Sequence, residues 1–186
     1  MWRGSVRRAV MAMRDAEMST SVVVADWIKR IVDDERKRDA VRLGEAETAA
    51  RRADLVRLNG RRLVDELRAA VTRDVEAFRE EFVGDPAHEI VLETTGSEGG
   101  FGVSKPASPA ASLTVTPRLE AASAVCHYRF TPTTGLPPRE DRVELAFAGD
   151  GGGTLRMKHL GTGQVFTTAD ALSEFLLGPI FTGRPR

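Results

Sequence analysis

The stretch AETAARRADLVRLNGRRLVDELRAAVTRDVEAFREEF, residues 46–82, decides the fold because it is long, free of proline and apolar along one side. Apolar or small residues recur along it in steps of three, four or seven positions, the spacing that places them on one helix face. We call this set the seam, and its members are Ala46, Ala49, Ala53, Val56, Gly60, Leu63, Leu67, Val71, Phe78 and Phe82. The stretch therefore predicts a helix that packs along one face.

The seam can pack against either of two partners, a second copy of the chain or the chain's own C-terminal half. The positions to which we assign self-association are Val56, Gly60, Leu63, Leu67, Val71 and Phe78. Asn59 with Gly60 is also a common helix stop, and Gly44 is a second position at which the helix could break. A helical hairpin is therefore the alternative, although the seam stays in phase through Gly60, which favours one unbroken helix.

The helical pattern extends toward the N-terminus, so residues 21–84 form the predicted helical, coiled-coil-like region. Its first turns carry an apolar stripe at helical spacing, made by Val24, Trp27, Ile28 and Ile31. Residues 33–42, DDERKRDAVR, are charged on nearly all sides, as in helices that cross solvent and are supported by local ion pairs. Residues 1–20 are expected to be disordered or to contain a mis-assigned start, with the true start at Met18; an organelle transit peptide is the alternative.

The pattern changes after VGDP, residues 83–86, because Gly84 can adopt the positive φ that ends a helix and Pro86 cannot continue one. Beyond it, apolar and polar residues alternate in short runs separated by Gly, Pro and Ser, which predicts consecutive strands joined by turns. The predicted strands are 89–95, 101–104, 112–116, 124–130, 142–148, 154–160 and 164–167. Residues 168–178 predict a helix that covers this sheet, so residues 86–186 form an antiparallel β domain.

These patterns predict an α+β protein: a long N-terminal helix, or a helical hairpin, followed by a small antiparallel β-sheet domain with a C-terminal helix packed on it. Gly178 and Pro179 are expected to end that last helix. The single cysteine of this 186-residue chain cannot form an intramolecular disulfide. No run approaches the ~20 apolar residues of a membrane helix, so we expect a cytoplasmic protein without a membrane contact.

The charge balance bears on the class of partner. The chain has 27 Lys and Arg residues and 27 Asp and Glu residues, so no global field attracts it to nucleic acid. Arginine pairs at 51–52 and 61–62 lie close to several aspartates and glutamates on the same predicted helix. A phosphate backbone favours uncompensated positive charge, so a nucleic-acid partner is not expected.

Two glycine clusters, at residues 149–153 and 161–163, raise the question of a phosphate-binding loop. Such a loop needs a strand before it and a helix N-terminus after it, because both aim backbone amides at the anion. Here strand patterns lie on both sides of each cluster. The clusters therefore predict hairpin turns, and no cofactor is expected.

Candidate catalytic groups are few. Cys126 and His127 are adjacent, but neighbouring side chains on a strand point to opposite faces, so Cys126 is predicted to be a buried core residue rather than a nucleophile beside its base. The histidines His88, His127 and His159 lack the spacing of metal ligands. The sequence assigns no catalytic, cofactor-binding or metal-binding residue.

One surface of the predicted sheet is a candidate for partner binding. If strands 124–130, 142–148 and 154–160 are neighbours, their outward residues form a mostly basic face. That face consists of His127, Arg129, Arg142, Glu144, Arg156 and Lys158. The alternative interpretation is an ordinary solvated sheet face; if the face binds an acidic partner, we assign the binding to His127, Arg129, Arg156 and Lys158.

The function is not determined by the sequence. Our first hypothesis is a non-enzymatic interaction or scaffold protein that self-associates through its long helix and binds another protein with its sheet. The alternatives are a small hydrolase or transferase, with a site near the loops that uses His127, Arg129 or His159, and a small-molecule-sensing regulator.

Overall fold

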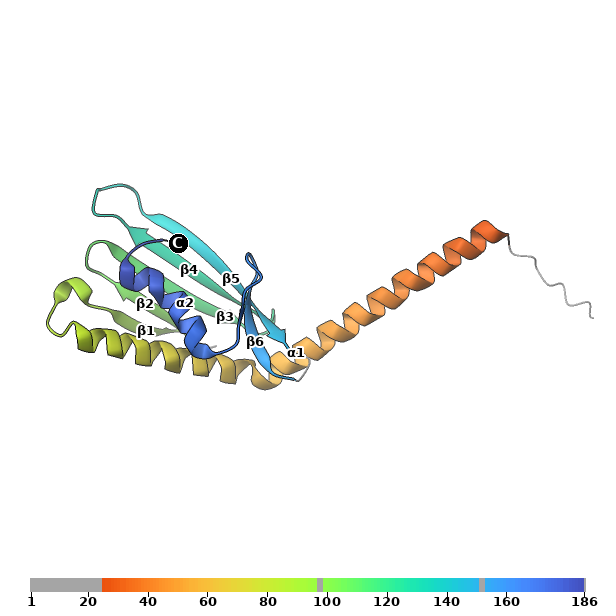
Figure 1. The fold of residues 1–186 in the computed structure, drawn as a ribbon, viewed down its shortest axis with the longest axis horizontal. Coiled ribbons are helices and arrows are strands. Elements are labelled where there is room, and N and C mark those ends of the chain that lie inside the picture. The colour runs from red at the N-terminus through yellow and green to blue at the C-terminus, as the bar shows by residue number, and fades with distance from the viewer. Residues whose placement is uncertain (1–24, 97–98, 151–152, 186) are drawn as a thin grey trace, which may run out of the picture. The chain divides into compact units, whose positions relative to one another are not determined.

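The computed structural model describes residues 25–96, 99–150 and 153–185. Within them lie a long helix α1 (Asp26–Glu81), a 3₁₀ turn η1 (Pro86–His88), seven strands and a C-terminal helix α2 (Ala169–Thr182) (Figure 1). The chain divides into two compact units, Met1–Glu45 and Ala46–Arg186. The order of elements confirms the predicted α+β class. The expectations for residues 1–20 and for Val24 concern positions outside the described residues.

Helix α1 is continuous from Asp26 to Glu81, so the helical hairpin is excluded. Neither Gly44 nor Asn59–Gly60 interrupts it. Gly60 is buried, and a Cβ at this position would lie 3.1 Å from the Leu119 side chain. The glycine therefore permits a close approach of another segment of the chain rather than ending the helix.

The part of α1 before the sheet contacts is stabilised by its own charges. Every residue from 25 to 54 is exposed, and several ion pairs join an acidic residue to a basic residue three positions later. These pairs are Asp26–Lys29, Asp33–Arg36, Asp34–Lys37, Glu35–Arg38 and Asp39–Arg42. Each contributes only about 0.3 kcal/mol, but all have the acidic member nearer the N-terminus, the favourable orientation. The ion pairs predicted for the charged segment 33–42 are confirmed.

The turn after α1 is set by three residues of VGDP. Gly84 adopts a φ of 78°, which ends the helical path at low cost. Asp85 then caps η1, because its carboxylate accepts a hydrogen bond of 2.9 Å from the Ala87 N–H, and Pro86 occupies the first position of that turn. The chain thus reverses from helix to strand within a few residues.

The seven strands form one antiparallel sheet in which each strand pairs with the next in sequence, as the short connections predict (Figure 1). The strands are β1 (Val91–Thr95), β2 (Gly100–Lys105), β3 (Ala110–Arg118), β4 (Ser123–Thr131), β5 (Arg139–Gly149), β6 (Leu155–His159) and β7 (Val165–Phe166). All the predicted strands are present. The main difference is that β5 begins at Arg139, three residues earlier than predicted.

One face of the sheet, the inner face, carries the core. Every second residue of the central strands is buried there, and both α2 and the second half of α1 lie against it (Figure 1). The largest buried side chains of the sheet are Phe101, Leu113, Tyr128, Phe130, Leu145, Phe147, Met157 and Phe166. Helix α1 adds Val56, Val64, Leu67, Val71 and Val75, and α2 adds Leu172, Leu176, Leu177 and Ile180.

The seam packs against the chain's own sheet, one of its two possible partners. Of the six positions to which we assigned self-association, Val56, Gly60, Leu67 and Val71 are buried in this core. Leu63 and Phe78 are partly buried against it. The buried stripe also includes neighbours of the seam, because a helix on a sheet buries an arc wider than a heptad seam. These side chains are occupied within the chain, and self-association itself stays a prediction.

Helix α2 extends further than predicted. Thr168 caps its start as expected, accepting a hydrogen bond from the Ala171 N–H, but the helix continues through Gly178 and Pro179 to Thr182. The prediction that Gly178 and Pro179 end it was wrong. Packing holds the last turn despite the proline, because Ile180 is fully buried and the Phe181 ring stacks on Phe78 at 4.2 Å. Gly183, with a φ of 65°, provides the stop.

We predict that Leu67→Ala lowers the free energy of unfolding by about 2–5 kcal/mol, because Leu67 is 2 % exposed and the smaller side chain leaves a cavity. Leu58→Ala is the matched control: it makes the same change on the same helix, but Leu58 is 70 % exposed. It should shift stability by about 0.5 kcal/mol or less. Chemical denaturation measures both. Equal losses in the two variants would contradict the packing of α1 on the sheet.

Candidate interaction face of the sheet

The second face of the sheet, which we call the outer face, is polar. Strand alternation places small residues on it along β2 and β3, and charged residues along β4, β5 and β6. The small residues are Gly102, Ser104, Ser112, Thr114 and Thr116; the charged or titratable ones are His127, Arg129, Glu140, Arg142, Glu144, Arg156 and Lys158. All of these are exposed or half-buried, whereas Val125, on the same face of β4, is buried at 3 %.

The four residues assigned to partner binding lie on this face. His127 and Arg129 come from β4, where they alternate with the buried Cys126 and Tyr128. Arg156 and Lys158 come from β6, and β5 lies between the two strands. Two strand spacings separate the pairs by roughly 10 Å, so the four form a broad surface rather than a compact site.

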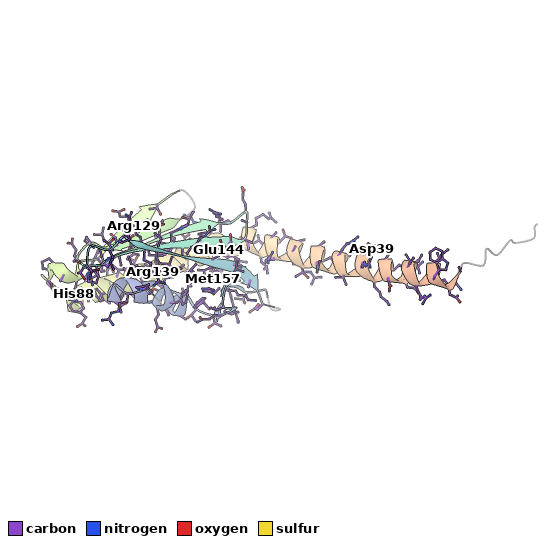
Figure 2. All side chains as sticks on the ribbon, turned by 90° about the horizontal axis from the view of Figure 1, so that it is seen from above. Asp39, His88, Arg129, Arg139, Glu144 and Met157 are labelled. Atoms are coloured by element: carbon purple, nitrogen blue, oxygen red, sulfur yellow. The ribbon has the colours of Figure 1, made fainter. Side chains whose placement is uncertain are left out.

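The outer face is less basic than predicted, because several of its cations have acidic neighbours. Arg142 forms an ion pair with Glu144 on the same strand. Arg156 forms one with Asp150, 3.0 Å away. In the sheet register, Arg129 lies opposite Glu140, although no ion pair joins their side chains within the described residues. Arg118 at the end of β3, Arg129 and Lys158 are thus exposed cations of this face for which the described chain shows no ion-pair partner (Arg129 and Glu144 are labelled in Figure 2).

The described chain shows where Cys126 and two of the histidines, His127 and His159, lie in the fold. Cys126 is fully buried on the inner face while His127 is exposed on the outer face, as predicted, so the two cannot act as a nucleophile and its base. His159 holds the β6–β7 turn, since its Nδ1 accepts hydrogen bonds from the Gly161 and Thr162 N–H groups at 2.9 and 3.0 Å. In the described residues no three metal-ligating side chains of His, Cys, Asp or Glu gather.

The first glycine cluster begins at the last residue of β5, Gly149, and continues into the β5–β6 connection, of which residues 151–152 lie outside the described residues; the second lies in the β6–β7 connection. Residues 150–154 join β5 to β6, and residues 160–164 join β6 to β7. Gly153 and Gly163 have φ values of 84° and 76°, which these turns require. The prediction of hairpin turns is confirmed, and neither cluster precedes a helix N-terminus.

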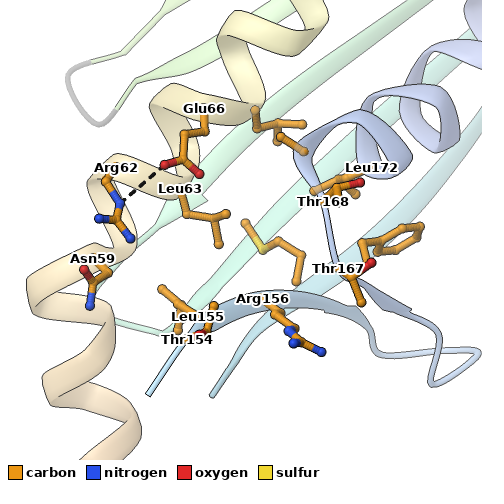
Figure 3. Close-up of a pocket in the computed structure, with 14 residues that line it drawn as sticks. Asn59, Arg62, Leu63, Glu66, Thr154, Leu155, Arg156, Thr167, Thr168 and Leu172 are labelled. Atoms are coloured by element: carbon orange, nitrogen blue, oxygen red, sulfur yellow. Dashed lines mark ion pairs between the residues drawn. The ribbon is translucent and has the colours of Figure 1, made fainter. Parts of the chain in front are cut away.

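A pocket of about 140 Å³ lies between α1, β6 and the start of α2 (Figure 3). Its lining is mixed: apolar side chains such as Leu63, Leu155 and Leu172 lie beside polar ones, namely Asn59, Arg62, Glu66, Thr154, Arg156, Thr167 and Thr168. Arg62 and Glu66 form an ion pair at 3.4 Å, drawn as the dashed line in Figure 3, so the charges at the rim offset each other. No local sequence pattern indicates this pocket, because its lining residues come from three separate segments.

A polar network joins α1 to α2 at the edge of the core. The fully buried Ser173 donates a hydrogen bond of 2.7 Å to Asp74 Oδ2. The Arg73 guanidinium contacts Asp74 at 2.8 Å and Asp170 at 2.9 Å. The hydrogen bond that Arg73 donates to Asp74, together with the one it donates to Asp170, raises the pKa of Arg73 above its ordinary value. In the sequence, Ser173 stands out only as a polar residue within the apolar run of α2. Its hydrogen-bond partner, Asp74, is brought close by the fold.

A second network holds the turn between α1 and β1. Asp85 caps η1, and its other carboxylate oxygen lies 2.7 Å from His88 Nδ1. The His88 ring stacks on Phe82 at 4.1 Å. The hydrogen bond from Ala87 and then the pairing with His88 lower the pKa of Asp85 below its ordinary value, and Lys105 contributes in the same direction. An open depression of about 500 Å³ adjoins this turn, and Arg79, Phe82 and Val83 are among its lining residues.

No protein-family model matches this chain, and no curated protein or solved structure gives a significant match. None of the helices in the described ranges is both long and apolar enough to cross a bilayer.

Ser173→Ala is expected to lower the free energy of unfolding by about 1 kcal/mol, because it removes a hydrogen bond to a carboxylate at the edge of the core. In an Asp74→Ala background the same substitution should cost close to nothing, so the double-mutant cycle isolates the contact. Ser112→Ala, on the outer face, is the control for the change of residue type. Additive effects of the two substitutions would show that the hydrogen bond does not stabilise the fold.

The variant Asp85→Asn tests how much the Asp85 carboxylate contributes to the free energy of unfolding at different pH values. A carboxylate whose pKa is lowered in the folded state stabilises the protein above its ordinary pKa of 3.8, and this contribution is lost as pH falls through the lower folded value. Asparagine still caps the turn, so the substitution removes mainly the charge. The variant should be less stable than wild type at pH 7, and the two should converge in acid. Urea titrations at several pH values measure this, with Glu76→Gln on α1 as the control for net charge; a gap independent of pH would contradict it.

Proposed function

We propose that the chain is a non-enzymatic interaction protein that binds a partner protein through the outer face of its sheet and self-associates through its long helix. One observation carries the proposal: the outer face is uncovered along several strands and presents Arg129 and Lys158 without an ion-pair partner among the described residues. Exposed cations of this kind attract a partner with an acidic surface and add specificity and association rate.

The small residues of the outer face support the same proposal. Along β2 and β3 the surface consists of glycine, serine and threonine side chains, which lose little conformational entropy on contact. Their hydroxyl groups can donate and accept hydrogen bonds. A partner could approach the backbone closely at Gly102 while Arg129 and Lys158 contact its acidic groups at the neighbouring strands.

The size of the enclosed pocket favours interaction over small-molecule chemistry. Sites for small molecules usually enclose roughly 300–1,000 Å³, and the pocket beside α2 has about 140 Å³. Two larger hollows, of about 500 Å³ beside Phe82 and about 610 Å³ beside Phe175, are open depressions rather than enclosed pockets. Of the residues that we considered for an enzyme site, His159 is engaged by the β6–β7 turn. The enzyme and the sensing regulator remain the alternative hypotheses. The cytoplasmic location and the lack of a nucleic-acid partner stay predictions.

Partner capture with matched charge variants tests this proposal. We would immobilise the full chain as wild type, as Arg129→Ser/Lys158→Ser, and as the control Arg57→Ser/Arg62→Ser, which removes the same charge from exposed positions of α1. Proteins captured from lysate would be quantified at low and at high salt. The proteins that bind the outer face should be lost with the first variant, retained with the control, and weakened by salt.

The opposite outcome is equally clear. If the wild type and the outer-face variant capture the same proteins in the same amounts, while both keep their denaturation midpoints, the outer face is not the binding surface. A saturable thermal shift of the wild type with a small metabolite would instead favour the sensing regulator.

A further inference from the structure

Strand β1 forms an open edge of the sheet. It is the first strand in the sheet order and pairs with β2 alone (Figure 1). In a strand that is paired on one side, alternate residues direct their N–H and C=O groups away from the sheet, where another strand can bind them. No hydrogen bond joins Val91–Thr95 to any described segment other than β2.

The neighbouring elements leave this edge accessible. Glu93 and Thr94 are exposed, although α1 lies against the inner face of the same sheet. The Ile90 carbonyl, directly before β1, is already bound, because Arg79 Nε donates a hydrogen bond of 2.8 Å to it. The open edge therefore begins at Val91 and continues to Thr95.

Sequence features that protect many sheet edges from pairing are missing from β1. The strand contains neither proline nor lysine, the two residues that most often block the addition of another strand. The opposite edge of the sheet differs, because β7 consists of only two residues, Val165 and Phe166. β1 has five residues, which is long enough for several backbone hydrogen bonds to an added strand.

The side chains along the β1 edge specify the charge of a suitable partner. Glu93 lies opposite Gly102 on the outer face, and Val91 and the extended residue Glu89 continue its row in steps of two. Glu89 and Glu93 are exposed, and neither forms an ion pair with a basic side chain in the described chain. Two uncompensated carboxylates four residues apart favour a strand whose basic side chains have the same spacing.

A second copy of β1 is a poorer occupant of this edge. A parallel pair in register, and an antiparallel pair centred on Glu93, both place Glu93 opposite Glu93. An antiparallel pair centred on Val91 places Glu89 opposite Glu93. Like charges directly opposed across two strands are destabilising, whereas a basic segment of another protein meets the same carboxylates with opposite charge.

The open depression beside the α1–β1 turn adjoins the same edge. Its lining includes Phe82 and Val83 from the end of α1 together with residues 89–91, and its volume is about 500 Å³. Phe82 and Val83 are 38 % and 84 % exposed. A strand bound along β1 reaches this depression at Glu89. An apolar side chain beyond its basic residues can therefore contact Phe82 and Val83 there.

We propose that the β1 edge binds an extended, basic segment of a partner protein, which adds an eighth strand to the sheet and places an apolar side chain in the depression beside Phe82 and Val83. Backbone hydrogen bonds then supply affinity, and the basic and apolar side chains supply specificity. This site is distinct from the basic part of the outer face, because it selects the opposite charge in its partner. The failure of one proposal leaves the other intact.

A peptide selection supplies the probe. Random peptides of about ten residues, displayed on phage, would be selected on the immobilised full-length chain, with soluble Glu89→Lys/Glu93→Lys chain present to remove peptides that bind elsewhere. The enriched peptides should carry two Lys or Arg residues four positions apart, β-branched residues between them and a large apolar residue at one end.

Matched charge variants then test the edge. The most enriched peptide would be synthesised with a fluorescent label and titrated with each chain by fluorescence anisotropy. Glu89→Lys/Glu93→Lys should weaken binding at least about tenfold. The control Glu76→Lys/Glu80→Lys makes the same change of charge at the same spacing on exposed positions of α1, and it should bind the peptide like wild type. Denaturation midpoints of both variants check that the fold is retained.

The depression has its own pair of variants. Val83→Ser removes an exposed apolar side chain from its lining and should weaken peptide binding several-fold. Val41→Ser makes the same change at an exposed position of α1 that is remote in sequence from the edge, and it should leave binding unchanged.

Methylation of the peptide backbone distinguishes strand addition from binding by side chains alone. N-methylation removes one amide donor at a time, and only alternate amides of an added strand point toward β1. Methylation at every second residue should abolish binding, while methylation at the intervening residues should be tolerated. Binding without this alternation, or equal binding by wild type and Glu89→Lys/Glu93→Lys, would overturn the proposal. A selection that enriches no peptide would overturn it as well, and a chain that is dimeric under those conditions would point to a second copy on the edge.

Discussion

The packing of the second half of α1 on the inner face of the sheet is the contact on which the rest of the structure depends. Val56, Leu67 and Val71 are buried there together with side chains from β2 to β6 and from α2. A single sheet with two open faces would expose its apolar residues to water, so one face must be covered. α1 and α2 together provide that cover. The outer face is left to the polar residues that alternate with the core, because the helices are on the other side.

The same helix meets two different physical demands along its length. Over residues 56–78 its stability comes from burial against the sheet, which is the usual source of helix stability in proteins. Over residues 26–54 there is no such contact, and the helix is supported by ion pairs between acidic residues and basic residues three positions later. Such pairs are individually weak, so the exposed stretch is the part of α1 whose structure gains most from a partner.

The candidate site on the outer face follows from strand alternation, and this explains which of its properties could be predicted. That His127 and Arg129 share a face opposite to Cys126 requires only the period of two residues in a strand. The period of two does not predict which cations of the outer face are neutralised by acidic neighbours. Asp150 reaches Arg156 from the β5–β6 connection, and Glu144 pairs with Arg142 two residues before it on β5. Those contacts depend on side-chain direction and loop path, which local periodicity does not specify.

The sequence by itself determined the elements: a long helix in phase from Trp27 to Phe78, a turn at Gly84 to Pro86, and consecutive strands joined by glycine and proline turns. These are local properties of spacing and backbone freedom, so they can be deduced residue by residue. Only the tertiary structure decided what the seam touches, because a helical stripe carries no information about which apolar surface will cover it. The tertiary structure also decided that α2 continues past Pro179. There the burial of Ile180 and the stacking of Phe181 on Phe78 outweigh the backbone hydrogen bond that proline cannot form.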